Sequence, residues 1–83
     1  MNVADEIKAV LGQVLGLGDR AQHFDSRTAL FGAIAELDSR AVVTLIAALE
    51  DKFGIVVADD EITAEVFETL GSLTEFIEAK LAA

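Results

Sequence analysis

An aspartate–serine pair, Asp38-Ser39, stands directly before a long apolar run, and it offers a hydroxyl beside a carboxylate. The simplest interpretation is structural, because both residue types are favoured helix caps, worth ~1 kcal/mol. A hydrolase would need a base for the serine. His23 is the only histidine, and no G-x-S-x-G motif surrounds Ser39. The pattern alone therefore favours a cap over a nucleophile.

Metal and nucleic-acid chemistry find little support in the composition. The chain has no cysteine to join His23 in a zinc site, and no D-x-[DN]-x-[DN]-G run predicts a calcium loop. The net charge of −9 opposes binding to a phosphate backbone. The acids concentrate in residues 50–78, where Lys52 is the single base. Such a surface suits basic protein partners or divalent cations, although solubility alone is an equally good explanation.

The apolar spacing predicts the elements that must position Ser39. A first helix is expected from Val3 to about Val14, with Asn2 as its N-cap and glycines at 16 and 18 to end it. Residues 17–38 lack a period, and we expect Leu30 and Phe31 to attach this long loop to the core. A second helix is predicted from Ser39 to Phe53, closed by Gly54. Apolar residues cover most of the circumference of this second helix.

The second half of the chain predicts shorter elements. Residues 55–58 are interpreted as an extended link, because no second strand is available to pair with them. A short helix is expected in 59–67, and a last helix whose start is either Thr69 or Ser72. The fold class is therefore all-α, a four-helix bundle in one domain of residues 1–83. The N-terminus does not read as a signal peptide, no apolar stretch is long enough for a membrane span, and the cysteine-free chain suits the cytoplasm.

Taken together, "LDS", the apolar helix, "ALEDKFGI", an acidic segment and "SLTEFIEAKL" resemble the acyl carrier protein family over the whole chain. The resemblance implies that Ser39 is esterified with 4′-phosphopantetheine from coenzyme A, and that Asp38 is the adjoining acid of the motif. The arm's thiol would carry an acyl group as a thioester. We expect loose packing along the second helix to admit the acyl chain between helices. The residues expected to line this acyl pocket are Val43, Ile46, Leu49 and Ile62.

The family resemblance also implies partners, namely a phosphopantetheinyl transferase and acyl-loading and acyl-accepting enzymes with basic surfaces, met by a monomeric carrier. Outward acids are thin along the second helix, where Ala41, Thr44 and Ala47 replace them. The residues expected to contact partners are Glu50, Asp51, Asp59, Asp60, Glu61 and Glu65. These departures suggest a specialised carrier, such as one from a bacterial exosortase or polysaccharide gene cluster. Two alternatives remain open: an aminoacyl or peptidyl carrier using the same serine, and an acidic interaction bundle that is not modified.

Arg40 departs most from the family pattern, in which an apolar residue usually follows the serine. A cation in the first turn opposes the helix dipole, at a cost of ~0.3–1 kcal/mol when exposed. Two explanations are available. The guanidinium pairs with Asp38 or Glu36, which we favour slightly at this point, or it reaches the phosphodiester on Ser39 and holds the base of the arm.

Overall fold

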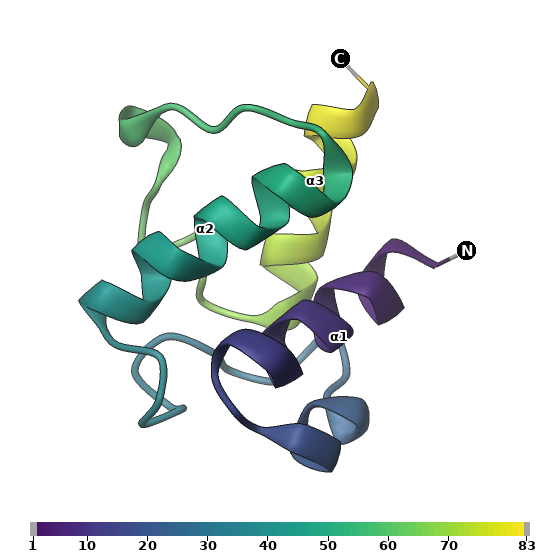
Figure 1. Ribbon diagram of the computed structural model, residues 1–83, viewed down its shortest axis with the longest axis vertical. Helices are drawn as coiled ribbons and strands as arrows, with labels where there is room; N and C mark the ends of the chain where they lie inside the picture. The colour runs from purple at the N-terminus through teal and green to yellow at the C-terminus, as the bar shows by residue number, and fades with distance from the viewer. Residues whose placement is uncertain (1, 83) are drawn as a thin grey trace.

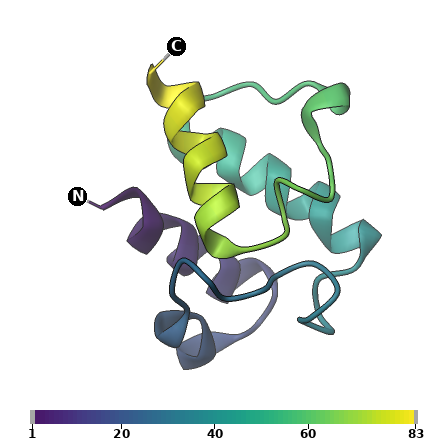
Figure 2. The same cartoon turned by 180° about the vertical axis from the view of Figure 1, so that it is seen from behind.

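The computed structural model describes residues 2–82, and these form three long helices joined by irregular segments with two short 3-10 turns. In chain order the elements are α1 (Val3–Val14), η1 (Gly18–His23), α2 (Ser39–Phe53), η2 (Asp59–Glu61) and α3 (Leu70–Ala82). No strand occurs within these residues, where one isolated antiparallel bridge joins Ala29 to Thr69. The predicted all-α fold is confirmed. Figures 1 and 2 show α2 and α3 crossing, with α1 beneath them.

The caps that the sequence predicted define the helix ends. The Asn2 side chain accepts a hydrogen bond from the Ala4 amide at 2.8 Å, and so begins α1. At the end of α2, Gly54 adopts the left-handed conformation (φ 65°), which costs glycine no steric clash, and its amide donates to the Glu50 carbonyl. For α3 the structure selects Thr69, whose hydroxyl accepts from the Ser72 amide while Ser72 Oγ accepts from the Thr69 amide.

The core lies where α1, α2 and α3 meet. Leu11 of α1, Leu45 and Leu49 of α2, and Leu73 and Ile77 of α3 are fully buried. α1 packs against α2, α3 and η1. Burial of these side chains stabilises the domain by roughly 1.5–3 kcal/mol each before the loss of chain entropy. A cysteine-free chain of this size depends on that burial.

The expected short helix of residues 59–67 begins at Asp59 as predicted but is only the 3-10 turn η2, three residues long. Glu61 and Glu65 therefore do not share a helix face. The β-branched residues Ile62 and Thr63 lower helix propensity directly after the turn. The end of the segment is also held by distant backbone, because the Phe31 amide donates to the Phe67 carbonyl at 2.9 Å.

The long loop between α1 and α2 is folded on itself and against residues 67–71. Its first part forms η1, which the sequence analysis did not predict. Further on, the Leu30 amide donates to the Glu68 carbonyl, the Leu70 amide to Thr28, and the Gly71 amide to Ser26, each at 2.9 Å. Leu30 is fully buried, so it attaches the loop to the core as expected, whereas Phe31 remains 43% exposed.

Candidate functional site

Asp38, not Ser39, caps α2. Asp38 Oδ1 accepts hydrogen bonds from the amides of Arg40 (3.1 Å) and Ala41 (2.8 Å), which satisfies two of the donors that a helix start leaves open. Ser39 is the first residue of the helix and is exposed. Among residues 2–82 its hydroxyl has no hydrogen-bond partner, so the hydroxyl is free for other chemistry.

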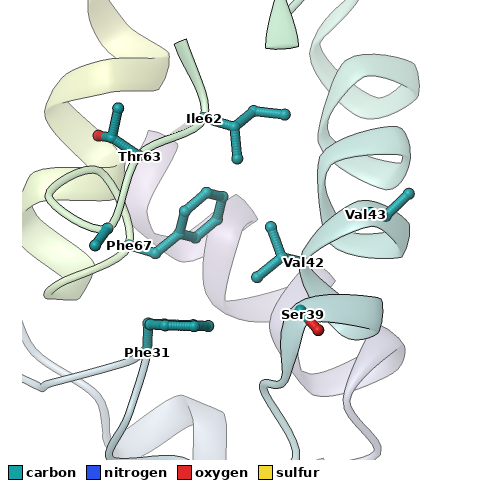
Figure 3. A pocket seen from close by; sticks show the side chains of 8 residues that line it. Phe31, Ser39, Val42, Val43, Ile62, Thr63 and Phe67 are labelled. Atoms are coloured by element: carbon teal, nitrogen blue, oxygen red, sulfur yellow. The ribbon is translucent and has the colours of Figure 1, made fainter. Parts of the chain in front are cut away.

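A mostly apolar cavity of about 310 Å³ lies beside Ser39, between the start of α2 and the segment that follows η2. Figure 3 shows Val42 on α2 and Ile62 and Phe67 on the opposite side pointing toward one another, with Phe31 below them. The complete lining consists of Phe31, Ser39, Val42, Val43, Ile62, Thr63, Ala64 and Phe67. An apolar space that shares a residue with the free hydroxyl suits an apolar group tethered to that hydroxyl.

Of the four residues expected to line an acyl pocket, Val43 and Ile62 border this cavity. Ile46 and Leu49 do not, since they are 5% and 0% exposed and belong to the core beneath α2. The sequence analysis missed five lining residues: Phe31, Val42, Thr63, Ala64 and Phe67. Val42 carried a usable signal, because it follows Ser39 by three residues and so shares its helix face.

The residues expected to bind partners divide into two groups. Asp51, Asp59, Asp60 and Glu65 are exposed. Glu50 and Glu61 instead brace the chain, since Glu50 Oε2 accepts from the Val57 amide at 2.8 Å and Glu61 is bound by Lys80 of α3. The Lys80 ammonium and the Ala58 amide, in that order, lower the pKa of Glu61. No group of three or more potential metal ligands occurs within residues 2–82.

The favoured pairing of Arg40 with Asp38 or Glu36 was wrong. Arg40 forms no ion pair among the described residues. Glu36 binds Arg20 at 2.8 Å, while Asp38 holds the backbone of the first turn. The Glu36 backbone amide, followed by Arg20, lowers the pKa of Glu36.

Known proteins are similar to this chain in sequence and in fold. The sequence model of the phosphopantetheine attachment site family matches residues 5–77. An acyl carrier protein of Sulfurovum sp. (strain NBC37-1) is 36% identical over 78 residues, which are 94% of this chain and 97% of that protein. The solution NMR structure of the holo acyl carrier protein of Nitrosomonas europaea superposes with a TM-score of 0.93 at 48% identity, and all of both chains is covered.

The names of these relatives bear on the alternatives that the sequence left open. Both are acyl carriers, not peptidyl carriers, and the solved protein is a holo form. The comparisons therefore favour neither a peptidyl carrier nor an unmodified bundle. No helix within residues 2–82 has the length and apolar character needed to cross a membrane. The chain belongs to the acyl carrier protein family, whose members carry cargo on covalently attached 4′-phosphopantetheine.

Proposed function

We propose that this carrier holds its acyl group on a 4′-phosphopantetheine arm esterified to Ser39. One observation carries the proposal: Asp38 performs the capping at the start of α2, so the exposed hydroxyl of Ser39 has no structural task. The family comparison supports an attachment site within residues 5–77, and Asp38-Ser39 is the pair that begins a long apolar helix.

The residues around Ser39 fit such an arm. A phosphodiester at the start of α2 faces the positive end of the helix dipole, which stabilises an anion. The Asp38 cap keeps the first turn formed and so keeps Ser39 at the surface, where a transferase can reach it. The arm, when attached, supplies a thiol that holds the acyl group as a thioester. The chain has no cysteine, so it cannot supply such a thiol itself.

The cavity beside Ser39 is the proposed resting place of the acyl group. Its mostly apolar walls come from Val42 and Val43 of α2 on one side and from Ile62 and Phe67 on the other. Transfer of an apolar acyl chain from water into the space between these walls is favourable by ~25 cal/mol per Å² of apolar surface buried. Ile46 and Leu49 fill the core behind α2 and serve packing in the structure as it stands.

The proposed partners are a phosphopantetheinyl transferase and the enzymes that load and remove the acyl group. Their basic surfaces would meet the exposed acids Asp51, Asp59, Asp60 and Glu65. Glu50 and Glu61 support the same region by holding its backbone and α3, as described above. We propose that these encounters occur in the cytoplasm, with the carrier as a monomer.

The test uses the purified chain, coenzyme A and a broad-specificity phosphopantetheinyl transferase. Intact-mass analysis should find one added phosphopantetheinyl group on the wild type and none on Ser39→Ala. Ser26→Ala is the matched control, because Ser26 also follows an aspartate but no long helix begins there, and it should be loaded like the wild type. Loading of Ser39→Ala, or loss of loading in Ser26→Ala, would contradict the assignment.

A further inference from the structure

Most of the basic residues of this acidic chain are held by carboxylates. Four of the six lysines and arginines form ion pairs: Lys8 with Asp5, Arg20 with Glu36, Lys52 with Glu6, and Lys80 with Glu61. Arg27 and Arg40 have no such partner among residues 2–82. In a chain with fifteen acids, a cation without an acidic partner is the exception.

Arg40 differs from Arg27 in its surroundings. It directly follows Ser39, which borders the cavity, and it is exposed. Of the nearest acids in sequence, Glu36 is bound to Arg20, and Asp38 Oδ1 accepts two backbone hydrogen bonds. Arg40 is therefore an exposed cation without an acidic partner among residues 2–82, and it adjoins in sequence the serine that we assign to the arm.

We propose that Arg40 is a positioning residue for the arm, whose guanidinium binds the phosphodiester on Ser39 in the holo protein. The inference rests on Ser39 being the attachment site. A guanidinium presents two parallel N–H donors that match the oxygens of a phosphate, and such charge-assisted pairs are the stronger hydrogen bonds. The phosphodiester adds a negative charge to a chain whose net charge is already −9, and Arg40 is the adjacent cation that offsets it. Binding at this point fixes the base of the arm beside Val43 and the cavity mouth.

The experiment compares apo and holo forms of the wild type, Arg40→Leu, Arg40→Lys and Arg27→Leu. Arg27→Leu removes the same charge from another exposed and unpaired arginine, outside the site. Intact mass is measured first and establishes that each holo sample carries one arm, and Ser39→Ala, which should gain none, assigns that arm to Ser39. If the wild type does not load there, the proposed attachment site is wrong, which is a separate outcome from the one tested next. Excess transferase drives loading of the variants to completion.

Thermal melts at low salt then give the holo-minus-apo difference in melting temperature for each chain. For Arg40→Leu we expect this difference to be roughly 2–5 °C less favourable than in the wild type, as for a partly exposed ion pair in a small domain. Arg40→Lys should keep part of the wild-type holo-minus-apo difference, because lysine retains the positive charge but lacks the two parallel N–H donors of the guanidinium. Arg27→Leu should match the wild type, and added salt should reduce the contrast.

A second measurement responds to contact and not to general stability. The ³¹P chemical shift of the holo protein should differ between the wild type and Arg40→Leu, and should be the same in the wild type and Arg27→Leu. Equal changes of the apo and holo melting temperatures in Arg40→Leu, or an unmoved ³¹P signal, would overturn the inference.

Discussion

Gly71, in the first turn of α3, is the position where a single added methyl group should be most informative. A Cβ built there would lie 2.7 Å from the Ser26 carbonyl oxygen and 3.2 Å from Ser26 Cβ. The obstacle is backbone, which cannot rotate away as a long side chain can. The same carbonyl accepts the Gly71 amide at 2.9 Å, so relief of the clash would lengthen that hydrogen bond.

The expected magnitude follows from three contributions. Alanine in place of a helical glycine favours the helix by ~0.5–1 kcal/mol. Overpacking against backbone costs about 1–3 kcal/mol, and a weakened hydrogen bond costs a further ~0.5–1.5 kcal/mol. The net of these ranges is a destabilisation of roughly 0.5–4 kcal/mol. We expect Gly71→Ala to lie near the middle, at about 2 kcal/mol, which lowers the melting temperature by roughly 8–16 °C for a chain of this size.

Gly12→Ala in α1 is the matched control. Its Cβ would meet the Gly18 carbonyl oxygen at 3.4 Å and Ala21 Cβ at 3.6 Å, which are ordinary contacts, so the helix-propensity gain should raise the melting temperature. Circular dichroism melts, with urea titrations for the free energy of unfolding, compare the two variants. If Gly71→Ala is as stable as the wild type or more stable, the close approach of Ser26 to α3 does not constrain this fold.

Two further predictions concern side chains that hold loop and helix ends. Asp38→Ala should lower the free energy of unfolding by ~1 kcal/mol in denaturant titrations, whereas Asp38→Asn keeps an acceptor and should lose only a fraction of that; equal losses would mean that the cap contributes little. The Lys80 ammonium and the Ala58 amide lower the pKa of Glu61 in the folded chain. The ionised carboxylate therefore stabilises the fold at pH values above 4.5, the usual pKa of the group, and this stabilisation is lost as the pH falls through the folded pKa. The stability difference between the wild type and Glu61→Gln should therefore be largest above about pH 4.5 and shrink at lower pH in melts across that range. A pH-independent difference would show that the ion pair is not its source.

Local signals in the sequence were enough to predict the long helices. Asn2, Asp38 and Gly54 are caps that act within a few residues of themselves, and each marks a helix end where the structure has one. Ser39 was singled out on equally local grounds, since only this serine joins an aspartate to a long apolar helix.

The features that sequence analysis missed depend on distant segments. Phe31 and Phe67 border the cavity together because their backbones are hydrogen-bonded across the fold, and no local pattern encodes that pairing. Glu36 was expected to be available to Arg40, but its partner is Arg20, sixteen residues earlier in the chain. The segment after Asp59 has acids that suit a helix start, yet its end is held by the loop, which limits the helix to one turn.

The hydrogen bonds that join residues 26–31 to 67–71 have a consequence for how the carrier opens. Neither segment pairs its backbone N–H and C=O groups internally as a helix does, so each depends on hydrogen bonds to the other. The two segments must therefore separate as one cooperative unit. Phe31 and Phe67 belong to this unit, and so does the start of α3 through the amides of Leu70 and Gly71. A guest large enough to move Phe31 away from Phe67 would strain the hydrogen bond between their backbones and, through the amides of Leu70 and Gly71, the first turn of α3. We expect any enlargement of the cavity in this direction to cost the free energy of opening this cooperative unit, which would limit the size of the guest.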